Sequence, residues 1–358
     1  MRGVKASQFA RNLTLIVATW ATWATWAACI SVAGYRAPEI VPSALAAAAS
    51  QGPATAQATR QAPSIPTPDT ETAYMCPMHP DYTSDTEGRC ARCGMNLVLA
   101  TPFDMRDYRL EFQTVPRVVK AGRKISLLFK VFHPGTGKPI QKFEPVHDKL
   151  YHLFVISQDM KDFQHIHPEQ RADGTWAIDV TLPRPGYYKV LSDFLPSGGS
   201  SQFIARPLVT AGYTGDLIAS SAYLEPDRDL TKTVDDISAE VTYEPKRFVA
   251  GSYGHLTFHL ADAATGQPVK DLQTYLGAFG HTLIMSEDMV DYVHSHPLES
   301  IPPEANLEEL RSGPDVTFEG LMPKPGHYRA WTQFRRHNKI YTFTNTFTVI
   351  DVGELSRR

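Results

Sequence analysis

Residues Pro183–Tyr188 read Pro-Arg-Pro-Gly-Tyr-Tyr, and the pattern returns at Pro323–Tyr328 as Pro-Lys-Pro-Gly-His-Tyr. A Pro-Gly turn that leads into a Tyr-containing apolar run is typical of the corner before a late strand in an immunoglobulin-type sandwich. The two copies lie 140 residues apart in a chain of 358 residues. This duplicated corner predicts two β domains in tandem.

The duplication extends to the earlier part of each domain. Thr136–Ile140 recurs as Thr265–Val269 at an offset of 129, and an insertion of 11 residues near Leu298–Leu310 accounts for the longer offset further on. Each repeat then has roughly 110 residues, which is an ordinary domain size. We therefore predict a first repeat at residues 103–212 and a second repeat at residues 236–352.

Alternating apolar and polar residues in Lys124–Phe132 and His255–Leu260 predict strands. About seven such runs in each repeat favour a mainly β fold of two tandem immunoglobulin-like β-sandwiches. One short helix is expected, around Pro303–Arg311 in the insertion. A double jelly roll of cupin type is the alternative, because each repeat has a His-x-His before its Pro-Gly. That fold would place a glutamate four or five residues after the second histidine, whereas Glu169 and Glu299 follow at two and three residues.

Three of the four cysteines lie in a short segment ahead of the repeats. Cys90 and Cys93 are separated by two residues and followed by Gly94, so a tight turn would direct both thiolates at one centre, which Cys76 and His79 can complete. Thiolates and thioethers select Cu(I), Ag(I) and Zn(II) over hard ions. A disulfide between any two of these cysteines is the alternative, but an odd number of thiols suits a metal site better. The predicted ligands are Cys76, Met78, His79, Cys90, Cys93 and Met95.

This segment, Tyr-Met-Cys76-Pro-Met-His-Pro followed by Cys90-Ala-Arg-Cys93-Gly-Met, resembles the heavy-metal-binding domain related to small YHS-type modules. That family occurs in copper-transporting P-type ATPases and in periplasmic adaptors of copper and silver efflux pumps. Ala91 stands where the family usually has proline and Asn96 where it usually has aspartate, and neither is a ligand position. The resemblance implies a small metal-binding module at residues 73–101, here called the Cys module.

Each repeat also carries three histidines at preserved spacing. If the chain reverses at Gln158-Asp159, His152 faces His165 across a hairpin, and His167 shares the face of His165. Three convergent imidazoles predict a Cu(II) or Zn(II) site whose fourth position is left for water, a carboxylate, Met160 or Met289. Histidines that only cap a polar edge of the core are the alternative. The first His set is His152, His165 and His167; the second His set is His281, His294 and His296.

The first repeat resembles copper-associated periplasmic domains of the YtkA-like type, through His152–Met160 and Phe163–Pro168. The second repeat matches this pattern less closely, at Tyr292–Pro297. Four further histidines are given no ligand role: His255 and His259 are expected on a solvated strand face, and His147 and His327 have no histidine counterpart in the other repeat.

The N-terminus predicts export. Arg2, Lys5 and Arg11 precede an uncharged run at Leu13–Gly34, so residues 1–35 form a signal peptide or a membrane anchor. Cleavage, lipidation and retention are all left open. Residues 36–72, rich in Ala, Pro, Gln, Thr and Ser, are predicted to be a disordered linker. The Cys module and the repeats are then expected in the periplasm or cell envelope, with membrane contact only through the N-terminal segment.

Taken together, these features favour an exported bacterial protein that binds copper, with silver or zinc as alternatives, for sequestration, resistance or delivery to efflux machinery. Its partners are then metal ions and a metal efflux pump or copper chaperone. A net charge of -3 without a basic tract argues against nucleic acid. A mononuclear copper or zinc enzyme and a partner-binding component of an efflux system are the alternatives. We predict binding without catalysis, because the chain has no nucleophile motif, no phosphate loop and no cysteine in its β domains.

Overall fold

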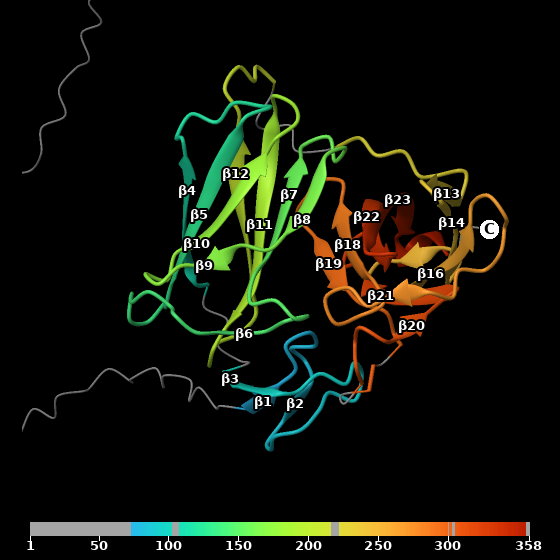
Figure 1. Ribbon diagram of the computed structural model, residues 1–358, viewed down its shortest axis with the longest axis horizontal. Coiled ribbons are helices and arrows are strands. Elements are labelled where there is room, and N and C mark those ends of the chain that lie inside the picture. The colour runs from blue at the N-terminus through green and yellow to red at the C-terminus, as the bar shows by residue number, and fades with distance from the viewer. Residues whose placement is uncertain (1–72, 102–106, 216–221, 300, 303–304, 356–358) are drawn as a thin grey trace, which may run out of the picture. The chain divides into compact units, whose positions relative to one another are not determined.

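The computed structural model describes residues 73–101, 107–215, 222–299, 301–302 and 305–355 (Figure 1). The chain divides into two units, Met1–Ser64 and Ile65–Arg358, and all the described residues belong to the second unit. The predicted export segment, the linker and Cys29 lie outside the described residues. Within the described ranges, no helix is long and apolar enough to cross a membrane.

The Cys module is a small three-stranded sheet of order β2-β1-β3, formed by β1 (Ala73–Met75), β2 (Thr83–Ser84) and β3 (Val98–Ala100). Cys76 directly follows β1, and Cys90 and Cys93 lie in the turn that precedes β3. Gly94 has a φ of 74°, and its N–H donates to Cys90 O at 2.8 Å. Glycine adopts this left-handed conformation at little cost, so the turn folds back and brings the two thiols together.

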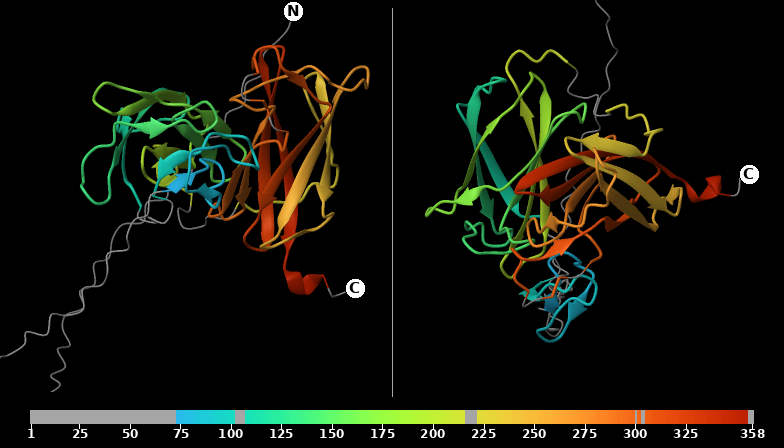
Figure 2. Two further views of the ribbon diagram at one scale, coloured as in Figure 1. Left: turned by 90° about the horizontal axis from the view of Figure 1, so that it is seen from below. Right: turned by 45° about the vertical axis from the view of Figure 1, so that its right-hand side comes forward.

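The first repeat is a sandwich of two antiparallel sheets (Figure 2). One sheet has the order β4-β5-β10-β9, and the other has the order β12-β11-β7-β8, with β6 paired to β11. Alternating residues of β5, including Leu127 and Phe129, point into the core and meet Trp176, Leu153 and Val190. The strands are β4 (Arg109–Val115), β5 (Lys124–Phe132), β6 (Phe143–Glu144), β7 (His152–Ser157), β8 (Phe163–Ile166), β9 (Glu169–Gln170), β10 (Trp176–Thr181), β11 (Tyr187–Pro196) and β12 (Gln202–Val209).

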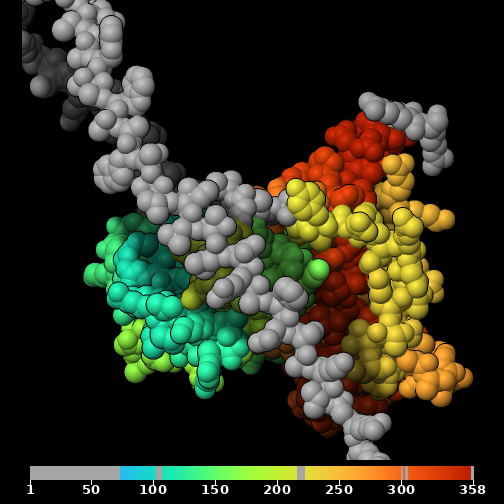
Figure 3. Space-filling view, turned by 90° about the horizontal axis from the view of Figure 1, so that it is seen from above, coloured from blue at the N-terminus to red at the C-terminus, as the bar shows by residue number. Residues whose placement is uncertain are grey.

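The second repeat has the same architecture, with one sheet of order β13-β14-β16-β21. The other sheet has the order β15-β23-β22-β17-β20, and β18 pairs with both β22 and β19. The segment around β13, yellow in Figure 3, lies on the surface of this repeat. The elements are β13 (Thr231–Val234), β14 (Ile237–Glu244), β15 (Phe248–Val249), β16 (Tyr253–Asp262), β17 (Leu272–Gln273), β18 (His281–Ser286), β19 (Tyr292–Ser295), β20 (Arg311–Ser312), β21 (Asp315–Leu321), β22 (Gly326–Arg336), β23 (Lys339–Ile350) and the 3-10 helix η1 (Val352–Glu354).

Both tyrosine corners are present. Tyr188 Oη donates to Arg184 O at 2.8 Å, and Tyr328 Oη donates to Lys324 O at 2.9 Å. The prediction of tandem β-sandwiches behind a small module is confirmed. The expected helix around Pro303–Arg311 is wrong for the residues described there, because 305–310 form turns and Arg311 begins β20. The insertion contains Asn306, whose side chain bonds Glu309 and so favours a turn.

Strands β7 and β18 are buried on both faces along their whole length. Leu153 and Val155 of β7 point into the core of the first repeat, whereas Phe154 and Ile156 enter a separate apolar cluster. That cluster also contains Leu283 and Met285 of β18. We call this contact the repeat interface. His152 and His281 lie on the same strand faces as these interface residues, because they precede Phe154 and Leu283 by two positions.

Candidate metal centres

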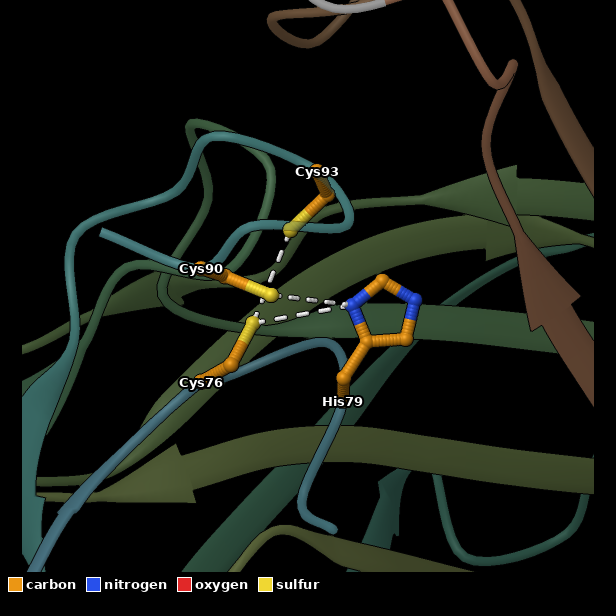
Figure 4. Close-up of side chains that lie close together, drawn as sticks. All are labelled: Cys76, His79, Cys90 and Cys93. Atoms are coloured by element: carbon orange, nitrogen blue, oxygen red, sulfur yellow. Dashed lines mark hydrogen bonds between the residues drawn. The ribbon is translucent and has the colours of Figure 1, made fainter. Parts of the chain in front are cut away.

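Four side chains converge in the Cys module (Figure 4). The Sγ atoms of Cys76 and Cys93 are 3.6 Å apart, and His79 Nδ1 lies 3.8 Å from Cys76 Sγ and 3.5 Å from Cys90 Sγ. Sulfur and nitrogen donors that share one tetrahedral ion, at about 2.3 and 2.0 Å, lie roughly 3.5–3.8 Å from each other. The four donors Cys76, His79, Cys90 and Cys93 therefore fit a single tetrahedral metal ion.

The three cysteines are free thiols, which does not favour the disulfide alternative. The hydrogen bond with Cys93 and burial raise the pKa of Cys76 to about 12, and the same bond lowers the pKa of Cys93. Without an ion, one thiol therefore holds its proton more firmly than the other. A bound cation displaces these protons, because thiolate is the form that ligates metal.

Met78 and Met95 pack beside the three cysteines in one apolar cluster, together with Leu97. Met78 Sδ lies 2.9 Å from His296 Nδ1, so this sulfur is directed at the second His set. The shell predicted for the Cys module is thus filled by three thiols and one imidazole, and the two methionines surround it.

In the first His set, the donor nitrogens come from two neighbouring strands. His152 begins β7, His165 lies in β8, and His167 directly follows β8. His152 Nδ1 lies 3.0 Å from His165 Nε2 and 3.3 Å from His167 Nε2. Two nitrogens bound to one tetrahedral ion lie roughly 3.3 Å apart, from metal-nitrogen distances of about 2.0 Å. All three side chains offer donors within 4.8 Å of one another.

The predicted hairpin register is wrong by two residues. Phe154, not His152, pairs with His165, and the same register places His152 opposite His167. Since side chains alternate with a period of two, a shift of two residues leaves every side chain on its predicted face. Convergence of the three imidazoles therefore survives the error. The turn is wider than expected, because Asp159 caps it by accepting from Ser157 Oγ and from Lys161 N.

The second His set has the same arrangement. His281 Nδ1 lies 2.7 Å from His296 Nε2, and the donors of the set lie within 4.8 Å of one another. Leu283 pairs with His294, which reproduces the register of the first repeat. Met160 and Met289 do not complete these sets, because they lie in the hairpin turns, away from His152 and His281, and are buried in the repeat interface.

The inward nitrogens of His152 and His281 are each matched by an outward N–H bond on the same ring. His152 Nε2 donates to Val146 O at 2.8 Å, and His281 Nε2 donates to Tyr275 O at 2.7 Å. A carbonyl only accepts, so these bonds leave the lone pair of the neutral ring on Nδ1. Such bonds fix the tautomer and orientation of metal-binding histidines. They therefore prepare both sets for a cation.

Burial keeps these imidazoles neutral. It lowers the pKa of His152 to about 4 and that of His167 to about 3, with further lowering by the charge of neighbouring histidines. The pKa values of His165, His281 and His296 are lowered for the same reasons. Neutral imidazole is the form that binds metal. His152 and His167 thus keep an unprotonated nitrogen well into the acid range.

Three residues of this region were missed or set aside at the sequence level. Gln333 Oε1 accepts from His165 Nδ1 at 2.9 Å, and Asp193 Oδ2 accepts from His294 Nδ1 at 2.9 Å. His147 is buried, and its ring centroid is 3.3 Å from that of His296. Gln333 and Asp193 occupy equivalent positions of β22 and β11. A polar residue at the same place in both repeats was the sequence feature that could have identified them.

Three histidines that were given no ligand role, His255, His259 and His327, lie away from both His sets. His255 and His259 pair with carboxylates on an outward face of β16, Glu319 at 3.2 Å and Asp315 at 2.8 Å. His327 is bonded to Thr348 on an exposed strand position. Such surface pairs are ordinary features of a solvated sheet.

The solved structures that match this chain share little sequence with it. Fibronectin(III)-like modules of Clostridium thermocellum CbhA are 9% identical, with 68% of this chain and 96% of theirs covered and a TM-score of 0.19. Yersinia pseudotuberculosis InvD is 10% identical, with 68% and 57% covered and a TM-score of 0.21. Escherichia coli alpha-2-macroglobulin is 10% identical, with 74% and 24% covered and a TM-score of 0.22. These scores are too low to support an argument about function. No curated protein matches the chain.

Two families match the sequence itself. The heavy metal binding domain matches residues 73–99, which include Cys76, His79, Cys90 and Cys93, and this supports metal binding by the Cys module. The domain of unknown function DUF8832 matches residues 104–208 and 232–351, that is, most of both repeats. Since these segments make up more than half of the chain, the protein belongs to the DUF8832 family and carries a heavy metal binding domain ahead of its two repeats.

Proposed function

We propose that the protein is exported and binds copper outside the cytoplasm, with silver or zinc as the alternative metals. The observation that carries this proposal is the convergence of Cys76, His79, Cys90 and Cys93 in a geometry that fits one tetrahedral ion. Thiolates favour Cu(I), Ag(I) and Zn(II). The positive n-region and the uncharged run of the first 35 residues support export.

The Cys module and the His sets bind different oxidation states of copper, because their ligands differ in softness. The Cys module takes the reduced ion, and the His sets take Cu(II) or another divalent ion, because imidazole suits these ions. The resemblance of the Cys module to domains of efflux systems, and of the first repeat to YtkA-like domains, supports a role in sequestration or in delivery to an efflux pump or chaperone.

Exchange of metal between the centres is part of the proposal. A cavity of about 570 Å³ is lined by Cys93 and Met95 of the Cys module and by His147 and His296 of the repeats. Met78 contacts His296 directly. Soft thioethers and imidazoles therefore border the space between the thiol site and the second His set, which supports passage of an ion inside the chain.

Metal analysis of the protein purified from the periplasm of copper-grown cells tests this function. We expect copper bound at more than one equivalent per chain, and loss of the Cu(I) fraction alone in Cys90→Ser/Cys93→Ser. Zinc in place of copper under these conditions would contradict the choice of metal. Export is tested separately by a reporter fused after residue 60, which should be active only outside the cytoplasm.

A further inference from the structure

The repeat interface is built from counterpart residues. Phe154 and Ile156 of β7 and Leu283 and Met285 of β18 form one apolar cluster, and Phe163 stacks on Trp331 with centroids 4.8 Å apart. Phe154, Ile156, Leu283 and Met285 are all buried, and an apolar cluster of this kind excludes water from what lies beside it. Because His152 and His281 belong to the same strand faces, both His sets border this interface.

Contacts across the interface are reciprocal. Lys189 Nζ of the first repeat donates to Met289 O of the second. Arg329 Nη1 of the second repeat donates to Met160 O of the first at 3.1 Å. Lys189 and Arg329 are counterparts in the duplication, and so are Met160 and Met289. Exchange of equivalent contacts is the mark of a two-fold, isologous interface.

The outward hydrogen bonds of His165 and His294 also cross the repeat interface in a reciprocal way. His165 of the first repeat bonds Gln333 of the second, and His294 of the second repeat bonds Asp193 of the first. Each set is therefore oriented by a side chain of the other repeat. Neither repeat alone contains a complete set with all of its supporting hydrogen bonds.

The inward nitrogens of these two histidines lack donors. His165 donates through Nδ1, so its Nε2 carries a lone pair, yet it faces the lone pair of His152 Nδ1 at 3.0 Å. His294 Nε2 is buried and has no hydrogen-bond partner. An unsatisfied buried acceptor costs free energy, and a cation at each position would satisfy it.

The rings of the two sets are also close to each other. His152 and His294 have centroids 5.2 Å apart, and His165 and His281 have centroids 6.1 Å apart. We propose that the two His sets form one dinuclear copper centre at the repeat interface, with one ion held by each set. The proposal rests on the proposed binding of Cu(II) by the His sets. It adds that the two ions are magnetically coupled and that both repeats are needed to hold each ion.

Electron paramagnetic resonance of the full chain loaded with Cu(II) tests the pairing. Cys76→Ser/Cys90→Ser/Cys93→Ser serves as the parent, because it lacks the three thiols of the Cys module that would bind or reduce the added copper. We expect two Cu(II) per chain and a spin-coupled spectrum with a half-field signal, since paramagnetic ions at such separations interact strongly. Two ions with a full, uncoupled signal would overturn the pairing while leaving binding intact. Absence of bound Cu(II) would overturn both the pairing and the role proposed for the His sets.

Two sets of variants locate the centre. In the parent, His165→Ala/His167→Ala and His294→Ala/His296→Ala should each leave one ion with an uncoupled spectrum. His255→Gln/His259→Gln, on the exposed face of β16, should leave the coupled spectrum unchanged. A coupled signal that survives loss of either set would refute the assignment.

Asp193→Asn tests the crossed support without removing a ligand, so it remains informative if a histidine variant fails to fold. We expect roughly a 10–100-fold loss of Cu(II) affinity at the second set, although Asp193 belongs to the first repeat. The exchange variant Asp193→Gln/Gln333→Asp should move the tighter site to the first set. If the second set keeps its affinity in both variants, each repeat binds its ion independently and the proposal is wrong.

Discussion

Met78 Sδ lies 2.9 Å from His296 Nδ1, so a residue of the Cys module is in contact with the second His set. Met78 also packs against Cys76 and Cys90. One side chain therefore adjoins both kinds of centre. This relationship separates two roles for the methionine, as a ligand of the soft ion or as a support for an imidazole.

Replacement of Met78 by leucine distinguishes these roles. Four other donors already fit the soft ion, so we expect Met78→Leu to retain one Cu(I) in the Cys module with affinity changed less than about tenfold. Cu(II) binding at the second set should weaken, because the His296 N–H loses its acceptor. Competition titrations with Cu(I) and Cu(II) chelators measure both. Met95→Leu is the matched control, and a collapse of Cu(I) affinity in Met78→Leu would make Met78 a ligand.

Loss of Cys90 and Cys93 should remove the soft site alone. Cys90→Ser/Cys93→Ser eliminates two of four donors, and we expect Cu(I) affinity of the Cys module to fall roughly a thousandfold or more. Titration of the full chain with a Cu(I) chelator measures the change. Asn96→Ser, in the same turn, is the control. Unchanged Cu(I) affinity in the double variant would place the soft ion elsewhere.

Acid should destabilise the metal-free protein. The pKa of His152 is about 4 and that of His167 about 3 in the folded chain, against about 6.5 when unfolded, because burial disfavours the charged rings. Below pH 6.5 the unfolded state therefore binds more protons, and stability falls as pH decreases toward 4 and 3. Each such histidine contributes about 1.4 kcal/mol per pH unit in this range.

Urea unfolding at pH 7.5, 6.5 and 5.5 measures this loss as a decrease in the midpoint. His152→Gln should flatten the dependence, since glutamine does not titrate. Cu(II) should raise the midpoint at all three pH values, because His152 and His167 are neutral in the folded state throughout this range. A midpoint that stays constant from pH 6.5 to 5.5 would show that the histidines are protonated in the native protein.

The two tyrosine corners should contribute equally. Tyr188→Phe and Tyr328→Phe each remove the hydroxyl bond to a backbone carbonyl and leave the ring in place; Tyr188 also loses two longer bonds, to Asp162 and from Arg184 N, both at 3.4 Å. We expect each change to lower the free energy of unfolding by about 1 kcal/mol. Tyr253→Phe, at a side chain that is 55% exposed, should have almost no effect. Chemical denaturation of the three variants checks the values, and a loss at only one corner would contradict the equivalence of the repeats.

Local patterns were enough to predict the architecture. The Pro-Gly-x-Tyr corner and the offsets of 129 and 140 residues reflect contacts within one repeat, and such contacts leave a periodic trace in the sequence. The Cys module was predictable for the same reason, because its donors come from a short segment with a turn at Gly94. The six histidines of the two sets were identified from their spacing, although the predicted hairpin register was wrong.

The repeat interface could not be predicted from strand alternation within each sandwich. A continuous apolar run such as Leu153–Ile156 indicates burial on both faces, but it does not say what covers the second face. Asp193 and Gln333 became recognisable only when the structure placed each one against a histidine of the other repeat. His147 was set aside for having no histidine counterpart, yet an unduplicated residue can still lie at an interface between duplicated ones.

The crossed support of the His sets has a consequence for how the two halves of the chain can diverge. In a homodimer of identical subunits, a substitution changes both copies of a position together. In this fused pair, position 193 is aspartate and its counterpart at 333 is glutamine. A carboxylate increases the electron donation of its imidazole partner more than an amide does. The two His sets therefore have the same backbone geometry but different chemical support. We expect copper to bind first at the second His set, whose His294 is supported by Asp193.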